Sequence, residues 1–144
     1  MTIDHRTELA GQLRLSVMRL ARRLRQQAPE GITPSQLSAL AVLEIHGPMT
    51  LGELAGAERV SPPTMTRVAF ALEESGLVAR EADEADRRRS VMRLTGEGRA
   101  LIRNSRRRKT AYLAARFQNL DAAELDTLER AAALMDRLVA EETP

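Results

Sequence analysis

Three consecutive arginines, Arg87, Arg88 and Arg89, stand at the centre of the stretch DEADRRRSVMRLT, residues 83–95. Neighbouring guanidinium groups repel one another, so the arrangement is unfavourable unless an anion offsets the charge. A guanidinium presents a fork of donors that suits phosphate oxygens and the edge of guanine. Asp86 comes two residues before Arg88, and its carboxylate can orient that guanidinium. The stretch predicts a site for an anionic partner, and a solvated charge run is the alternative.

A second set of polar side chains lies at the start of a predicted helix, in SPPTMTRVAFALEESG at residues 61–76. Ser61 is a typical N-cap, and Pro62 suits the first helical position. Helical spacing turns one apolar stripe towards a core, made of Met65, Val68, Ala69 and Leu72. The opposite side carries Pro63, Thr66 and Arg67, with Thr64 on the flank. Such side chains near a helix N-terminus are suited to the major groove of DNA, and a solvated Arg67 is the alternative.

The composition argues against an enzyme. There is no cysteine, which excludes disulfides, thiolate metal sites and thiol-based redox sensing. His5 and His46 are the only histidines, and they do not stand at a metal-ligand spacing. There is no G-x-S-x-G motif, and TGEG at residues 95–98 is too short for a phosphate loop. We therefore expect no catalytic residues, no metal and no cofactor.

Charge and hydropathy give weaker bounds. The net charge is only +2, so bulk charge alone does not predict a polyanionic partner, although all but one of the 22 basic residues are arginine. No apolar run approaches the roughly 18 residues that a membrane span needs. The polar start MTIDHRTE does not resemble a signal peptide. These features predict a cytoplasmic protein without a membrane partner.

The elements before the two motifs are predicted to be helices. A helix over about residues 6–28 is followed by the breaker APEGI, and its apolar stripe is Leu9, Leu13, Val17, Leu20 and Leu24. Thr33 and Gln36 form a capping box, with Pro34 in the first turn, for a second helix that is apolar almost all round from Leu37 to Ile45 and is expected to be buried. TLGE at residues 50–53 begins a short third helix, and the turn AERV separates it from the helix at residue 61. The pair has the outline of a helix-turn-helix.

The elements after the two motifs are a hairpin and two helices. The β-prone runs at residues 77–81 and 90–94 predict a hairpin with the arginines at its tip. Thr95 caps a fifth helix of about twenty residues, whose expected inner face is Leu101, Ile102, Ser105, Tyr112, Leu113 and Phe117. Asp121 and Glu124 begin a last helix with a seam typical of helix pairing, at Leu125, Leu128, Ala132, Met135 and Val139.

This order predicts a mainly α protein, a winged helix-turn-helix core with flanking N- and C-terminal helices. Apolar stripes on the first and last helices exceed what one small core would cover, which favours a homodimer. Phe70 falls off the core stripe, and we expect it to pack on a neighbouring helix. The basic run at residues 106–109 is interpreted as a solvated face, with a DNA contact as the alternative.

Residues 61–101 resemble the signature of the MarR family of bacterial winged-helix regulators. The matching pieces are the Ser-x-x-Thr-x-Thr-Arg helix start, Leu-Glu-Glu-x-Gly-Leu-Val-x-Arg, the Asp-x-x-Asp-Arg-Arg wing and Leu-Thr-x-x-Gly. The resemblance implies one MarR-like domain over residues 1–144, with dimerisation helices at 1–32 and 96–144 and a DNA-binding lobe at 33–95. It also implies that Ser61, Thr64, Thr66 and Arg67 face the major groove and that Asp86 and Arg88 act at the minor groove. With Pro63, Arg87 and Arg89, predicted from their positions, these residues make up the expected DNA-binding set.

In that set, Arg88 would enter the minor groove with Asp86 as its brace, and Arg87 and Arg89 would hold phosphates. The resemblance further implies a homodimeric transcriptional regulator that binds a pseudo-palindromic operator in double-stranded DNA. We expect a repressor released by a small-molecule effector, because many members release DNA when a small ligand, often phenolic, enters a cleft beside the dimer helices. A winged helix that binds only proteins is the alternative function.

Overall fold

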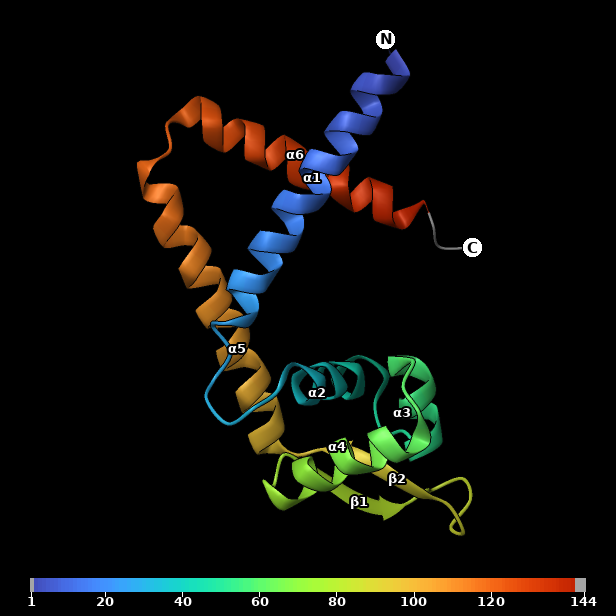
Figure 1. Cartoon of the computed structure of the whole chain (residues 1–144). Coiled ribbons are helices and arrows are strands. Elements are labelled where there is room, and N and C mark those ends of the chain that lie inside the picture. The colour runs from blue at the N-terminus through green and yellow to red at the C-terminus, as the bar shows by residue number, and fades with distance from the viewer. Residues whose placement is uncertain (1, 142–144) are drawn as a thin grey trace. The chain divides into compact units, whose positions relative to one another are not determined.

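The computed structural model describes residues 2–141 and is mainly helical (Figure 1). Its elements, in chain order, are α1 (Thr2–Arg25), α2 (Pro34–His46), α3 (Leu51–Glu58), α4 (Pro62–Glu74), β1 (Val78–Ala82), β2 (Ser90–Leu94), α5 (Gly96–Arg116), the 3-10 helix η1 (Phe117–Asn119) and α6 (Ala122–Ala140). They form two compact units, one up to residue 109 and one from residue 110 on. The predicted order of elements and the mainly α winged-helix fold class are confirmed. The division into a lobe at 33–95 and dimerisation helices stays a prediction.

Several helices begin at the caps that the sequence predicts. Thr33 accepts a hydrogen bond at 3.1 Å from the backbone N–H of Gln36, whose side chain accepts one from Thr33 in return. Asp121 and Glu124 form the same reciprocal box at the start of α6. Thr95 accepts from the backbone N–H of Gly98 at 3.1 Å and donates to the carbonyl of Gly76 at 2.7 Å, so it joins the start of α5 to the end of α4. Local capping chemistry therefore sets where these helices begin.

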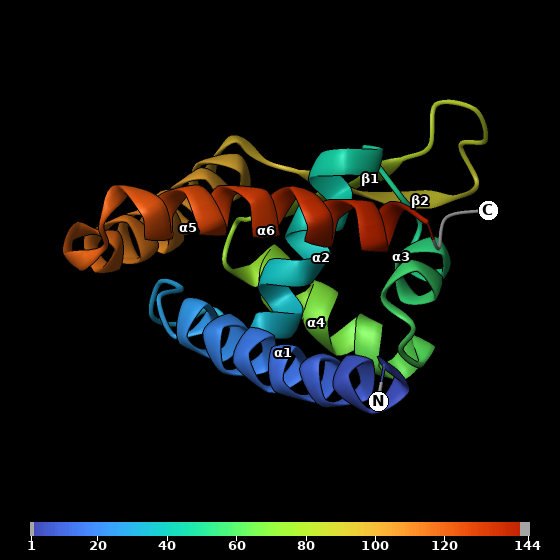
Figure 2. The ribbon, with the colours of Figure 1, turned by 90° about the horizontal axis from the view of Figure 1, so that it is seen from above.

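The hairpin is a two-stranded antiparallel sheet in which Val78 pairs with Leu94 and Ala82 with Ser90. The first strand begins one residue later than predicted. A backbone bridge between Met49 and Met92, with hydrogen bonds of 3.1 and 2.7 Å, fastens the segment before α3 to β2. Figures 1 and 2 both show the loop between β1 and β2 extending beyond the ends of the strands. The hairpin is the wing of the fold.

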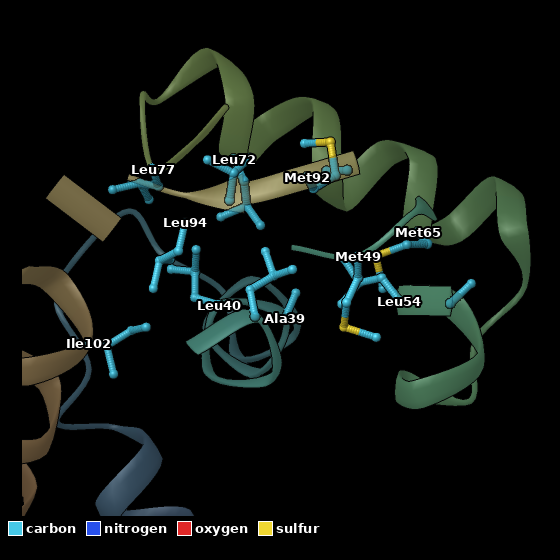
Figure 3. Close-up of a cluster of buried hydrophobic side chains, with 14 residues drawn as sticks. Ala39, Leu40, Met49, Leu54, Met65, Leu72, Leu77, Met92, Leu94 and Ile102 are labelled. Carbon is cyan, nitrogen blue, oxygen red and sulfur yellow. The ribbon is translucent and has the colours of Figure 1, made fainter. Parts of the chain in front are cut away.

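The hydrophobic core of the first unit lies between the wing and α2, α3, α4 and the start of α5 (Figure 3). The predicted stripe of α4 is confirmed, with Met65, Ala69 and Leu72 buried and Val68 partly buried against the same cluster. The other elements contribute Ala39, Leu40, Leu43, Met49, Leu54, Ala55, Leu77, Val78, Met92, Leu94 and Ile102. Burial of these side chains supplies the main driving force for folding of the lobe.

Gly98 allows α5 to pack closely on the wing. A Cβ at this position would overlap the backbone carbonyl oxygen of Leu77 and the side chain of Leu94. Farther along the helix, Ile102 and Ser105 are buried as predicted, and the Ser105 hydroxyl has no hydrogen-bond partner within the part of the chain that the structure describes. The first half of α5 is thereby an integral part of the lobe.

Three apolar residues differ from the predictions. Ile45 is 73% exposed although α2 is apolar almost all round, because the core covers only the face that carries Ala39, Leu40 and Leu43. Phe117 lies in η1, after α5 has ended, and is 37% exposed rather than on the inner face of the helix. Phe70 is 58% exposed on α4, so within residues 2–141 no neighbouring helix covers it.

The long terminal helices carry most of the exposed apolar surface. On α1 the predicted stripe residues Leu9, Val17 and Leu20 are exposed, and Met18 is exposed beside them. Within the second unit, α6 has no buried residue, and its exposed large side chains are Leu125, Leu128, Leu134, Leu138 and Val139. None of the helices that the structure describes has the length and apolar character to cross a membrane.

Candidate nucleic-acid interface

The turn between α3 and α4 is tight and sets where α4 begins. Arg59 adopts the left-handed conformation, with a φ of 56°, and caps α3. The backbone N–H of Val60 donates to the carbonyl of Ala55 at 3.0 Å, and Ser61 then serves as the N-cap of α4. This short connection gives the two packed helices the geometry of a helix-turn-helix, with α4 in the position of the recognition helix.

The first turn of α4 is fixed by its own side chains. The Ser61 hydroxyl accepts a hydrogen bond from the Thr64 backbone N–H at 3.3 Å and lies 2.9 Å from the Thr64 hydroxyl. The Thr66 hydroxyl donates to the Pro62 carbonyl at 2.9 Å, and the residue is exposed. Arg67 reaches back to the Thr64 hydroxyl at 3.4 Å. The polar side chains are thus held in one arrangement before any ligand arrives.

The exposure of these residues matches the face that the sequence predicts. Pro63, Thr66 and Arg67 are exposed, and Ser61 is exposed at the cap. Thr64 is half-buried, in agreement with its predicted place on the flank. Pro62 and Pro63 have no backbone N–H, and the Thr64 N–H donates to Ser61, so the helix N-terminus favours a phosphate through the positive end of its dipole.

The wing carries one guanidinium, that of Arg88, which is oriented by an ion pair and yet exposed to solvent. Arg88 donates from Nε to Oδ1 of Asp86 at 3.1 Å and from Nη2 to Oδ2 at 3.4 Å. Its side chain is nevertheless 91% exposed. The hydrogen bond from the Arg88 side chain, and then that from the Arg88 backbone N–H, hold the pKa of Asp86 below its ordinary value. The ionised Asp86 carboxylate therefore binds the Nε and Nη2 edge of the guanidinium and leaves Nη1 available to a ligand.

The two neighbouring arginines lie differently from each other. Arg87 is exposed and makes no ion pair within residues 2–141. Arg89 donates from Nη2 to Oε1 of Glu53, on the first turn of α3, at 2.7 Å. Sequence reasoning missed Glu53, because it lies 36 residues from Arg89 and only the fold brings the two together.

The recognition helix and the wing belong to the same packed lobe. α4 packs on β1, and β1 pairs with β2, so the structure brings the helix set and the wing set of predicted residues into one unit. Within residues 2–141 no group of histidine, aspartate and glutamate side chains is suited to a metal ion. The arrangement offers hydrogen-bond donors and positive charge, which is chemistry for binding an anion rather than for a reaction.

The basic run at residues 106–109 is not uniformly solvated. Arg106 forms an ion pair with Glu44 of α2, and Arg107 and Arg108 are exposed. Lys109 is half-buried and borders a cavity of about 210 Å³, whose lining is Arg25, Ala28, Ile32, Pro34, Leu37, Ser38 and Lys109. The cavity is mostly apolar with two cations at its edge.

Comparison with known proteins agrees with this geometry. The model of the MarR family matches residues 32–90. An HTH-type transcriptional regulator of Mycobacterium leprae is 41% identical over 140 residues, 96% of this chain and 98% of that protein. The HTH-type transcriptional repressor MdtR of Bacillus subtilis is 34% identical over 96 residues, 63% of this chain and 62% of that protein. A solved MarR family protein from Bacillus stearothermophilus is 28% identical with a TM-score of 0.79, and the match covers 97% of this chain and 99% of that one.

These relatives are regulators of transcription and not enzymes. The regulators of the matched family bind DNA and act as dimers. The resemblance of residues 61–101 to the MarR family is confirmed by the family model and by the solved MarR family protein, and the relatives are named as HTH-type transcriptional regulators. With a helix-turn-helix, a charged wing and long helices at both ends, the chain belongs to the MarR family of winged helix-turn-helix transcriptional regulators.

Proposed function

We propose that two copies of this chain bind a pseudo-palindromic operator in double-stranded DNA and control transcription there. The observation that carries the proposal is the Arg88 guanidinium, which donates two hydrogen bonds to Asp86 and is oriented by them while its side chain stays 91% exposed. Orienting an exposed arginine in this way costs side-chain entropy and gains little stability. A wing arginine that enters the minor groove of a duplex explains the arrangement, because the negative potential is deepest there at A·T-rich steps.

The recognition helix supplies the base contacts in this proposal. Arg67 reads a guanine edge, Thr66 offers its methyl group to thymine or its oxygen to a donor, and Pro63 makes apolar contact. Ser61 caps the helix, its hydroxyl lies 2.9 Å from that of Thr64, and the positive end of the helix dipole faces a phosphate. Arg87, exposed on the wing, holds a neighbouring phosphate. Half-sites then lie about one helical turn apart on the duplex.

The homodimer is supported by the exposed apolar side chains of the terminal helices. Leu9, Val17 and Leu20 on α1, and Leu125, Leu128 and Leu138 on α6, lie open to water in a single chain. Large exposed apolar patches mark interaction sites, and a second copy that brings the same surfaces would cover them. We propose this role for the predicted dimerisation segments at residues 1–32 and 96–144, of which the first half of α5 also packs on the lobe.

Repression that is released by a small molecule is the mode of control that we propose. A dimer seated on its operator excludes other proteins from the same stretch of duplex, and one relative, MdtR, carries the name of a repressor. The cavity of about 210 Å³ has room for a ligand of one ring, and Arg25 and Lys109 at its edge favour an acidic group. An aromatic acid is the class of effector that fits this lining.

Gel-shift titration of operator fragments with the Arg88→Ala variant tests the proposal. Operator affinity is expected to fall at least tenfold, while the dimer stays folded. Arg103→Ala is the matched control, because it removes the same charge from an exposed position on α5, and it is expected to leave affinity nearly unchanged. Equal affinities of Arg88→Ala and the wild type would refute the assignment of the wing to DNA. A wild type that binds all duplexes equally at low ionic strength would favour a protein-binding module instead.

A further inference from the structure

Arg89 closes the wing loop with its backbone and fastens it with its side chain. Its N–H donates to the carbonyl of Asp86 at 2.9 Å, which makes residues 86–89 a β-turn with Arg87 and Arg88 at the corner. Its carbonyl accepts from the N–H of Asp83 at 2.9 Å, at the other side of the loop. Since the backbone of Arg89 is fixed twice, whatever holds its guanidinium also holds the turn that carries Arg88.

Glu53 is the group that holds this guanidinium, and it is itself fixed. Its Oε1 accepts from Arg89 at 2.7 Å and from the Thr50 hydroxyl at 3.1 Å. The Thr50 hydroxyl in turn accepts from the Glu53 backbone N–H at 3.1 Å, as the N-cap of α3. A carboxylate in the first turn of a helix is also favoured by the helix dipole. The partner of Arg89 is therefore positioned by the first helix of the helix-turn-helix.

We propose that the Glu53–Arg89 ion pair is a brace that joins the wing to α3 and so positions Arg88 relative to the recognition helix. The inference rests on the proposed DNA-binding function. Both side chains are about half exposed, at 50% and 51%, so the pair contributes little to overall stability. Its value lies in orientation, because it connects α3 to the turn on which Arg88 stands. Glu53 is thus a positioning residue for DNA binding, and Arg89 acts through it rather than on a phosphate.

The sign of the effect of removing Glu53 separates the brace from simple electrostatics. Loss of a negative charge near the duplex strengthens DNA binding if only charge matters, whereas loss of a brace weakens it. We expect Glu53→Ala to weaken operator binding roughly three- to tenfold in fluorescence anisotropy titrations. Glu84→Ala is the matched control, because it removes the same charge from an exposed position in the wing loop and is expected to leave binding equal or slightly stronger.

Salt dependence separates a brace from a phosphate contact at Arg89. The slope of log K against log salt concentration is negative, and loss of one phosphate contact reduces its magnitude by about 0.9. Arg89→Gln is expected to weaken binding as much as Glu53→Ala does, with an unchanged slope. The charge-swapped double variant Glu53→Arg with Arg89→Glu restores the ion pair in reverse and is expected to recover most of the affinity that Arg89→Glu alone loses.

Three results would overturn the brace. They are stronger or unchanged binding by Glu53→Ala, a smaller magnitude of the salt slope for Arg89→Gln, or no recovery of affinity in the charge-swapped double variant. Arg88→Ala, measured beside them, keeps the two proposals apart. If Arg88→Ala weakens binding and Glu53→Ala does not, the brace is wrong and the wing still binds DNA. If neither variant changes affinity, the proposed function of the wing fails with it.

Discussion

At the scale of single residues, the wing shows how one carboxylate prepares one guanidinium. Asp86 engages Arg88 through two oxygens and also accepts the Arg88 backbone N–H. The sequence places Asp86 two residues before Arg88, and from this spacing we predicted that the carboxylate orients the guanidinium. The Glu53–Arg89 pair was not visible, because no local pattern signals a contact across 36 residues.

The lowered pKa of Asp86 gives a prediction with a defined sign. The Arg88 hydrogen bond is its main cause, so Arg88→Ala should raise the pKa of Asp86 towards its ordinary value. Stabilisation from a lowered pKa is fully present above the unfolded value and is lost only as the pH falls through the folded value. Between about pH 8 and pH 5 the Asp86–Arg88 ion pair is therefore expected to stay intact.

Titration of the Asp86 side-chain carboxyl by carbon-13 NMR, in the wild type and in Arg88→Ala, measures both parts of this prediction. Arg103→Ala serves as the control, because it removes an arginine that does not contact the wing carboxylate. A midpoint that is the same in the wild type and in Arg88→Ala would show that the guanidinium does not hold Asp86 in solution.

At the scale of elements, the predictable part of the fold is the part that local chemistry decides. Thr33, Ser61, Thr95 and Asp121 were named as caps from sequence, and each caps a helix. Ile45 was expected to be buried and is not, because an apolar run does not reveal which of its faces the core will cover. The closeness of α5 to the wing also needed the fold, since Gly98 by itself reads as a helix-weakening residue.

Gly98→Ala is expected to destabilise the lobe by about 1–3 kcal/mol, because the new Cβ would overlap the Leu77 carbonyl, which is backbone and cannot rotate away. Gly96→Ala is the matched control at the start of the same helix, where a Cβ meets nothing within 4 Å. That change should be neutral or stabilise by up to about 1 kcal/mol. Urea denaturation at one protein concentration compares the two, and equal midpoints would contradict the close packing.

At the scale of the whole molecule, the exposed apolar side chains of α1 and α6 set the expected assembly. The sequence predicted the stripes from their spacing, and their exposure in a single chain agrees with surfaces that await a partner. Spacing could not say that Met18 on α1 and Leu134 and Leu138 on α6 would be exposed as well. Residues outside a regular seam become part of such a surface only through the arrangement of the helices.

Leu128→Asp is expected to shift the chain from dimer to monomer in sedimentation velocity, because it places a charge in the proposed dimer contact. Loss of the second half-site contact should then lower affinity for the full operator by roughly 100-fold, with little effect on binding to a single half-site. Thr127→Asp adds the same charge one residue away, off the predicted seam, and is expected to remain dimeric. A Leu128→Asp variant that sediments as a dimer would refute the role of α6.

The backbone bridge between Met49 and Met92 has a consequence for how quickly a site is found. Because the segment that leads into α3 is hydrogen-bonded to β2, and α4 packs on both α3 and β1, the recognition helix and the base of the wing belong to one packed unit. A duplex then contacts the recognition helix and the wing in a single encounter, and little conformational entropy of the protein remains to be lost after the first contact. Pre-organisation of this kind favours fast association, so that differences between operators emerge mainly in how long each complex survives.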